Sequence, residues 1–253
     1  MRRLLLILLL FLPALPALAQ GNAPAMEPKE RCALPDSLRF VDAPLQNLAK
    51  ALKARGEIRI VVLGTSSSLK HDTGGLARTY VAGLPDALQA RFPAKQFAID
   101  NLSMRTQSTA QMQKRIAAEV IPAKPDLLIW QTGNVEAARQ TDTNSFAENL
   151  TDGLRRLHAA GIDAILIAPQ YRARLSPMVD TERFDQMMNW VGDSEGVPVF
   201  PRHDMMQFWA ENEVFDLQAK NQETQIREAE AMNGCLAQQL AEMIRRAVAL
   251  PGR

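Results

Sequence analysis

Five short apolar runs, separated by segments of helical periodicity, constrain the fold of this chain more than any other feature of its sequence. The runs have the length of buried strands and cover Ile58–Leu63, Phe97–Ile99, Asp126–Trp130, Asp163–Ala168 and Val197–Phe200. Between them, apolar residues recur every three or four positions, which is the spacing of one helical face. Strands that alternate with helices indicate right-handed β–α–β units and a parallel sheet covered by helices on both sides.

The first residues have the pattern of a signal peptide. Arg2 and Arg3 supply the positive start, Leu4–Leu12 form the apolar stretch, and Ala17-Leu18-Ala19 fits a small-x-small cleavage site. The apolar stretch is shorter than the roughly twenty residues that span a bilayer. We therefore expect cleavage after Ala19 and a periplasmic or secreted protein; a retained anchor is the alternative.

The remaining chain has the size of one large α/β domain. We expect a signal peptide at residues 1–19, an N-terminal extension at 20–44 and one domain at 45–253. The 29 Lys and Arg residues nearly balance the 28 Asp and Glu residues, and no basic run is present. This balance argues against nucleic acid or an anionic membrane as the main partner. No segment after the leader is apolar enough to span a membrane.

The chain has two cysteines, Cys32 and Cys235, one near each end of the mature protein. In an oxidising compartment such a pair is most simply a disulfide, and two buried free thiols are the alternative. A bridge over so long a loop would stabilise the fold by about 4–5 kcal/mol in the chain-entropy model. It would fasten the N-terminal segment to the last helix.

The residues just after each strand are where a parallel sheet places its ligands. The first strand is followed by Gly64-Thr65-Ser66-Ser67-Ser68, a glycine turn rich in hydroxyls. A serine there can offer its hydroxyl as a nucleophile and its backbone N–H to an oxyanion. On the motif alone, serines that cap the next helix are the more common case. The glycine spacing and the lysine of a phosphate-binding loop are missing.

These motifs give the chain a resemblance to the SGNH (GDSL-type) hydrolases over roughly residues 57–248. The Gly-x-Ser turn after the first strand, Asn101 after the second and the Trp130–Asn134 stretch after the third stand at the positions of that family's motif blocks. The paired cysteines and Pro169-Gln170 are similar to an exported branch with a Gly-Ser-Ser-Ser-Thr turn. The resemblance implies a three-layer α/β/α fold with a five-stranded parallel, flavodoxin-like sheet.

The resemblance also implies roles for individual residues. Ser66 corresponds to the nucleophile, and its own N–H to an oxyanion donor. Gly133 matches the glycine of the third block, whereas Asn134 stands one position before the usual asparagine, where this chain has Val135. The second block departs further, because no glycine follows Asn101.

The catalytic base of the family is absent from its usual place. Where the family has Asp-x-x-His before the last helix, this chain has Glu228 at the acid position and Ala231 at the histidine position. Alanine accepts no proton, so a serine at the site would need another base. His203, which follows the fifth strand beside an aspartate, is the favoured surrogate. His71 and a carboxylate of Glu228 or Glu230 are alternatives.

Two functions remain open from the sequence. The first is a cell-envelope hydrolase in which Ser66 attacks an ester, such as an O-acetyl group on a sugar. The second is a non-catalytic relative that binds a small-molecule or glycan ester. Gln131 and Gln170 would contact such an oxygen-rich ligand or cap the strand ends. No cofactor is expected, and the spacing of the histidines and cysteines does not match a zinc motif.

Overall fold

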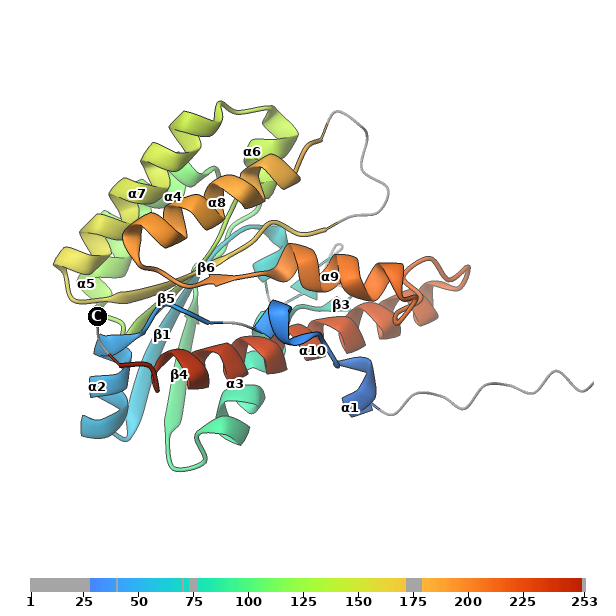
Figure 1. Ribbon diagram of the computed structural model, residues 1–253, viewed down its shortest axis with the longest axis horizontal. Helices are drawn as coiled ribbons and strands as arrows, with labels where there is room; N and C mark the ends of the chain where they lie inside the picture. The colour runs from blue at the N-terminus through green and yellow to red at the C-terminus, as the bar shows by residue number, and fades with distance from the viewer. Residues whose placement is uncertain (1–27, 40, 70, 73–76, 172–178, 252–253) are drawn as a thin grey trace, which may run out of the picture.

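A parallel sheet of five strands forms the centre of the computed structural model, which describes residues 28–39, 41–69, 71–72, 77–171 and 179–251 (Figure 1). The strands are β1 (Glu57–Leu63), β4 (Gln96–Asn101), β5 (Leu127–Gln131), β6 (Asp163–Ile167) and β7 (Val199–Phe200). Their spatial order is β4-β1-β5-β6-β7, and all neighbouring pairs are parallel. The predicted fold class and flavodoxin-like strand order are confirmed.

The last strand is shorter than the sequence predicts. The predicted run begins at Val197, whereas β7 contains only Val199 and Phe200. Pro198, between Val197 and Val199, has no N–H to donate to a strand ladder, although its carbonyl accepts from Leu166 N at 3.1 Å. The edge strand therefore begins only after the proline.

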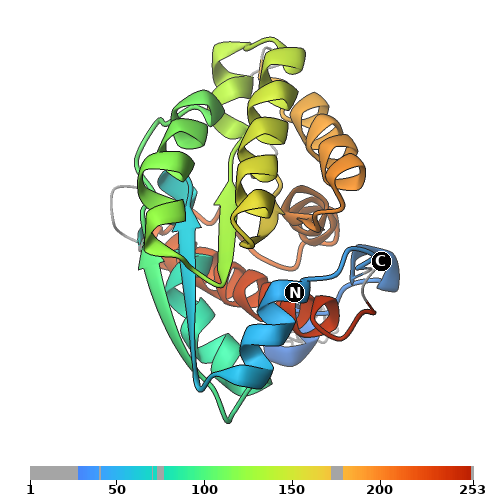
Figure 2. The same ribbon diagram turned by 90° about the vertical axis from the view of Figure 1, so that its left-hand side faces the viewer.

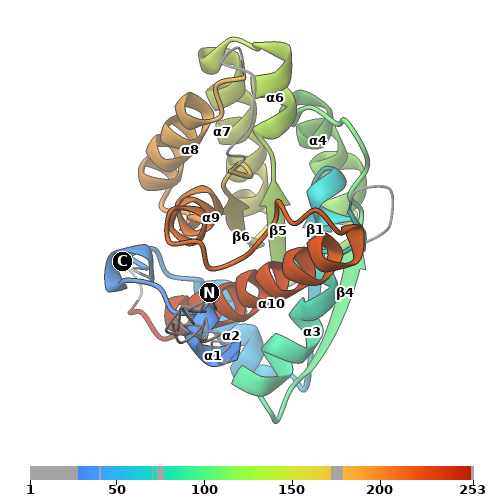
Figure 3. The same ribbon diagram turned by 90° about the vertical axis from the view of Figure 1, so that its right-hand side faces the viewer.

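Helices cover both faces of the sheet. Figure 1 shows α4, α7 and α8 on one side and α2, α3 and α10 on the other, and Figures 2 and 3 show the same layers from the two ends. The first layer consists of α4 (Thr109–Arg115), α5 (Ile121–Ala123), α7 (Thr143–Ala159) and α8 (Glu182–Glu195). The second consists of α2 (Gln46–Ala54), α3 (Tyr80–Arg91), α9 (Arg202–Glu211) and α10 (Gln222–Ala247). Shorter elements are α1 (Pro28–Arg31), α6 (Asn134–Arg139), a π-helical turn at Ile116–Val120, and 3-10 turns at Asp36–Arg39 and Ser66–Ser68.

Alternating residues of the strands separate two apolar cores. In β1, Ile60 and Val62 belong to the core beneath α3 and α10, whereas Val61 and Leu63 belong to the core beneath α4, α7 and α8. This is the period-two pattern of a strand that is buried on both faces. Helix α3 begins at Tyr80, just after a short antiparallel pair, β2 (His71–Asp72) and β3 (Ala77–Arg78).

The N-terminal segment is fastened to the last helix. Cys32 and Cys235 form the predicted disulfide, with their Cα atoms 5.1 Å apart, so the alternative of two free thiols is wrong. Beside it, Gln239 Nε2 donates to the carbonyl of Cys32 at 2.9 Å, and Leu45 N donates to Ala247 O at 3.2 Å. The last helix therefore serves as the anchor for the segment that enters the domain.

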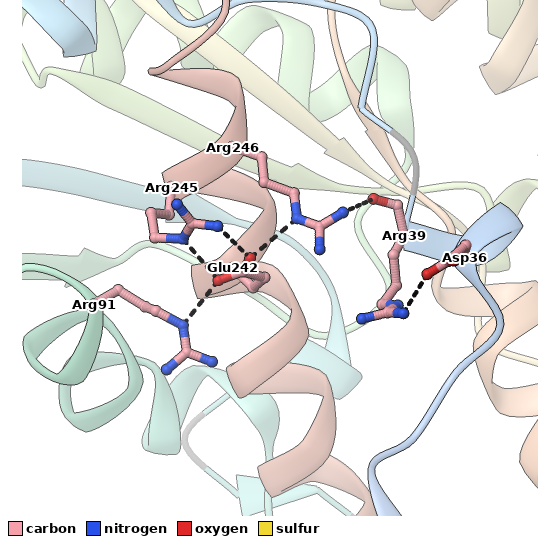
Figure 4. A network of polar contacts seen from close by, with 6 residues as sticks. All are labelled: Asp36, Arg39, Arg91, Glu242, Arg245 and Arg246. Carbon is pink, nitrogen blue, oxygen red and sulfur yellow. Dashed lines mark hydrogen bonds and ion pairs between the residues drawn. The ribbon is translucent and has the colours of Figure 1, made fainter.

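Charged groups add to this attachment near the end of α10 (Figure 4). Glu242 accepts hydrogen bonds from Arg245 at 2.7 Å and from Arg246 and Arg91 at 3.0 Å each. These arginines, Arg245 foremost, lower the pKa of Glu242 to about 2. Arg246 also donates to the carbonyl of Arg39 at 3.1 Å, which links the network to the N-terminal segment. We name Glu242, its three arginine partners and the link from Arg246 to Arg39 the α10 clasp.

The leader predicted at residues 1–19 lies outside the described residues, so its cleavage stays a prediction. Within the described part of the chain, no helix is both long and apolar enough to cross a membrane.

Candidate active site

The serine turn lies at the carboxyl end of β1. The strand ends at Leu63, and the chain passes through Gly64 and Thr65 into the helical turn Ser66–Ser68. Only a glycine fits at position 64, because a Cβ there would lie 2.7 Å from Ser68 Oγ and 3.1 Å from Gln131 Oε1. Thr65 and Ser68 are buried, whereas Ser66 is partly exposed. The Ser66 hydroxyl has no hydrogen-bond partner among the described residues.

One buried side chain, Gln131 at the end of β5, holds the turn. Its Oε1 accepts from Thr65 N at 2.9 Å, Thr65 Oγ1 at 3.0 Å, Ser68 Oγ at 3.1 Å and Ser67 Oγ at 3.3 Å. Gln131 is fully buried. A residue that the sequence suggested as a ligand contact therefore lies beneath the turn, where it positions the serines rather than facing a ligand.

Arg202 and Tyr80 complete this network, and sequence reasoning assigned neither to the site. Arg202 lies in α9 after β7, is 2% exposed, and donates to Ala168 O at 3.1 Å and to Ser67 Oγ at 3.0 Å. The Tyr80 hydroxyl lies 2.8 Å from Ser68 Oγ. Burial raises the pKa of Tyr80, and the nearby Arg202 opposes that rise. Arg202 lies two residues after the end of β7, and this position is the one sequence signal that could have identified it.

Ser66 lines a small cavity with the start of α6. The cavity measures about 210 Å³, and its walls comprise Thr65, Ser66, Ser67, Thr106, Asn134, Val135, Ala138 and Arg139. Asn134 Oδ1 accepts from the backbone N–H of Gln170 at 2.9 Å, which leaves the amide NH₂ group as its donor. The structure therefore brings together Ser66, Asn134 and the neighbouring Val135. This volume is below the range of about 300–1,000 Å³ that is typical of drug-sized ligands.

Two other predicted oxyanion residues have partners elsewhere. Gly133 has a φ of 96°, and its N–H donates to Glu136 Oε2 at 3.1 Å. Asn101 donates from Nδ2 to Ser68 O at 2.7 Å and accepts from Ser103 N at 3.1 Å. In this arrangement Gly133 shapes the loop and Asn101 supports the serine turn from the β4 side. The buried Glu136, which sequence reasoning did not single out, fixes the loop that carries Asn134.

His203, the favoured surrogate base, lies at the carboxyl edge of the sheet but on the half away from Ser66. Ser66 follows β1 and His203 follows β7, so three strand spacings, about 14 Å, separate their strands. Hydrogen bonding needs donor and acceptor within about 3 Å, so His203 would have to move to reach the serine. Its Nδ1 lies 3.3 Å from Asp204 Oδ1, and its ring meets Tyr171 edge-on at 5.4 Å between centroids. Its role as a base stays a prediction.

The other base candidates are held elsewhere or are not described. Glu228 lies within α10, forms an ion pair with Arg31, and accepts from Asp216 N at 3.3 Å. Glu230 Oε1 accepts from Arg78 N at 3.1 Å. The backbone of His71 belongs to β2, but its side chain lies outside the described part of the structure.

Larger hollows open at the opposite edge of the sheet. They measure about 540 Å³ and 460 Å³ and share Asn47, Gly161 and Ile162, near the amino ends of β5 and β6. Ligands of open parallel sheets bind at the carboxyl ends instead. We therefore assign the candidate site to the smaller cavity beside Ser66.

Solved structures of esterases share this fold. A mutant of Axe2, an acetyl-xylooligosaccharide esterase from Geobacillus stearothermophilus, aligns with a TM-score of 0.61 at 16% identity, over 77% of this chain and 95% of that one. A lipase/acylhydrolase from Enterococcus faecalis aligns with a TM-score of 0.56 at 20% identity, over 75% and 96%. No curated protein shows significant sequence similarity to the chain.

A family model assigns the chain to a protein family, whereas structural neighbours of such low sequence identity show only a shared fold. It describes the Non-GDSL lipase-like family and matches residues 31–250, which span the sheet, its covering helices and both cysteines. The resemblance to SGNH-type hydrolases inferred from the sequence is confirmed by this match and by the shared fold. The protein belongs to the Non-GDSL lipase-like family.

Proposed function

We propose that the protein is an exported acyl-ester hydrolase that removes a short acyl group, such as an acetyl group on a glycan, with Ser66 as its nucleophile. One observation carries the proposal: the partly exposed Ser66 lines a cavity of about 210 Å³ together with Asn134, at the carboxyl edge of the sheet. One structural neighbour, Axe2, is an acetyl-xylooligosaccharide esterase according to its name, which supports the choice of substrate class.

In the proposed reaction, Ser66 Oγ attacks the acyl carbonyl carbon and loses its proton to a base. The negative charge on the carbonyl oxygen would be stabilised by the backbone N–H of Ser66 and the NH₂ group of Asn134. Breakdown of the tetrahedral intermediate expels the alcohol and leaves an acyl-serine, which water hydrolyses. Movement of His203 toward the serine turn, or a contribution from His71, would supply the base.

A second candidate function is ester binding without turnover. It is favoured by Ala231 at the histidine position of the family motif and by the ion pair that holds Glu228 against Arg31. A site of this kind would retain the cavity and the Asn134 donor but would not cleave the ligand. The protein would then act as an accessory or binding component of the cell envelope.

The two candidates are separated by the turnover of p-nitrophenyl acetate. If the protein is a hydrolase, Ser66→Ala should reduce the rate by at least about 10³-fold, because the nucleophile is lost. The matched control is Ser145→Ala, which removes an exposed hydroxyl from the first turn of α7 and should leave the rate unchanged. Equal background rates in the wild-type protein and Ser66→Ala would overturn the hydrolase proposal.

Binding and export need separate measurements. For the second candidate, calorimetric titration with an acetylated xylooligosaccharide should give saturable binding that Asn134→Ala weakens, and the absence of binding would exclude it. For export, N-terminal sequencing of the protein from a periplasmic or secreted fraction should begin at Gln20. An intact Met1 in a cytoplasmic fraction would refute export.

A further inference from the structure

A second group of polar side chains lies at the carboxyl edge of the sheet, away from Ser66. Asp185 is on α8, and His203 and Asp204 are in the first turn of α9. One ligand atom from each residue lies within 4.8 Å of the other two. We propose that Asp185, His203 and Asp204 bind a divalent transition-metal ion such as Zn²⁺ or Mn²⁺.

An unsatisfied buried oxygen supports a ligand at this position. Asp185 is 7% exposed, and its Oδ1 is buried without a hydrogen-bond partner in the described part of the chain. Its Oδ2 accepts from Asn189 Nδ2 at 3.2 Å. A buried carboxylate oxygen without a partner carries a large desolvation cost, which a bound cation would offset.

The residue types indicate which cations would bind. An imidazole nitrogen with two carboxylates favours Zn²⁺ or Mn²⁺ over Mg²⁺ and Ca²⁺, which prefer oxygen ligands alone. Metal–ligand distances near 2.0–2.2 Å place ligand atoms about 3–4 Å apart, so a contraction of roughly an ångström would complete the set. Asp204 is partly exposed, which gives an ion a route of entry and leaves room for water ligands.

Neighbouring residues already support the three side chains. Asn189 holds one oxygen of Asp185, and the ring of Tyr171 packs edge-on against His203. Such outer contacts orient metal ligands in known sites. A bound ion would tie the start of α9 to α8, directly beside Arg202, which reaches Ser67. The site is thus suited to fixing α9, and with the ion bound His203 would be held away from Ser66, which leaves His71 as the base of the proposed reaction.

The proposal is tested by titrating untagged, chelator-treated protein with Zn²⁺ or Mn²⁺ in a calorimeter. We expect one ion per chain, with an affinity that falls at least 100-fold in Asp185→Asn and in His203→Gln. The matched control is His158→Gln, which changes an exposed histidine near the opposite edge of the sheet and should leave binding unchanged.

A thermal melt gives an independent measurement and checks that each variant folds. At free metal about 100 times Kd, the wild-type Tm should rise by roughly 5–10 °C, and the two ligand variants should melt cooperatively without that rise. Absence of saturable heat and of a Tm shift in the wild-type protein would overturn the proposal. So would full binding by a double variant, Asp185→Asn with His203→Gln.

Discussion

Gln131 and Glu242 each gather several hydrogen-bond donors, but they do so in opposite surroundings. Gln131 receives four donors on a neutral amide oxygen beneath the serine turn. The carboxylate of Glu242 accepts hydrogen bonds from three arginines at the surface of α10, where its side chain is 19% exposed. The first centre positions the candidate site, and the second belongs to the α10 clasp that attaches the N-terminal segment.

The difference follows from the cost of burying charge. A carboxylate at position 131 would have to be desolvated completely, whereas an amide oxygen accepts the same donors without carrying a full charge. Near the surface, Glu242 keeps part of its hydration and gains from its cationic partners. We therefore expect the serine turn to be insensitive to pH and salt, and the ionic part of the α10 clasp to depend on both.

The largest expected effect comes from removing the covalent part of the attachment. Replacing both Cys32 and Cys235 by Ala should lower the free energy of unfolding by about 3–4 kcal/mol, because the bridge joins residues 203 positions apart and restricts the unfolded chain. Urea unfolding at pH 7 measures the loss. The wild-type protein under reducing conditions should approach the variant. A loss below about 1 kcal/mol would show that the noncovalent contacts of this region suffice.

The substitution Gln131→Leu removes the neutral amide acceptor beneath the serine turn. Thr65 N and the hydroxyls beside it would lose their common acceptor inside the protein, which should cost about 2–3 kcal/mol of unfolding free energy. The loss should be the same at pH 5 and pH 9, because none of the groups that lose their partner titrates in that range. Denaturant unfolding at the two pH values is the measurement.

A matched variant separates the acceptor from the volume of the side chain. Gln131→Glu keeps an oxygen in place with the same shape, and Arg202 lies across the network to compensate part of the new charge. Its loss should therefore be smaller than that of the leucine variant and should increase with pH as the new carboxyl ionises. Equal losses in both variants would show that packing, rather than the shared acceptor, holds the turn.

The sequence predicted the parts of this architecture that local patterns encode. The five strands were predicted because buried strands are apolar runs, and the serine turn was singled out because ligands gather at the carboxyl ends of strands. The choice of Ser66 within that turn followed from the family resemblance. Asn134 was likewise put forward because it stands beside the asparagine position of the family's third motif block. The strand order followed from the family resemblance, and the disulfide from the pair of cysteines in a chain with a predicted leader.

Long-range contacts could not be predicted in this way. Arg202 reaches Ser67 across 135 positions of sequence, and only the packing of α9 against the sheet brings its guanidinium to the turn. Asp185 joins His203 and Asp204 because α8 and α9 both begin at the carboxyl edge. The absence of a zinc motif in the sequence therefore did not exclude a cluster assembled by tertiary structure.

The smallest expected effect is that of Glu242→Gln, which removes the carboxylate at the centre of the α10 clasp. The folded-state pKa of Glu242, about 2, lies below the usual value of 4.5 because the arginines stabilise its charged form. The contribution to stability is therefore fully present above about pH 4.5 and is lost as the pH falls toward 2. Allowing for solvent screening around the exposed arginines, the variant should lose about 1–2 kcal/mol at pH 7.

Two comparisons distinguish this ionic contribution from a loss of packing. The difference between the wild-type protein and Glu242→Gln should shrink when unfolding is measured between pH 4.5 and pH 2, and it should also shrink in 1 M salt, where the screening length is about 3 Å. Glu148→Gln, on the exposed side of α7, is the matched control and should change stability by less than about 0.5 kcal/mol. A loss of unfolding free energy in Glu242→Gln that persists at pH 2 and in high salt would contradict the ionic account. Gln131 and Glu242 would then both stabilise the fold mainly through uncharged contacts and would differ only in their location.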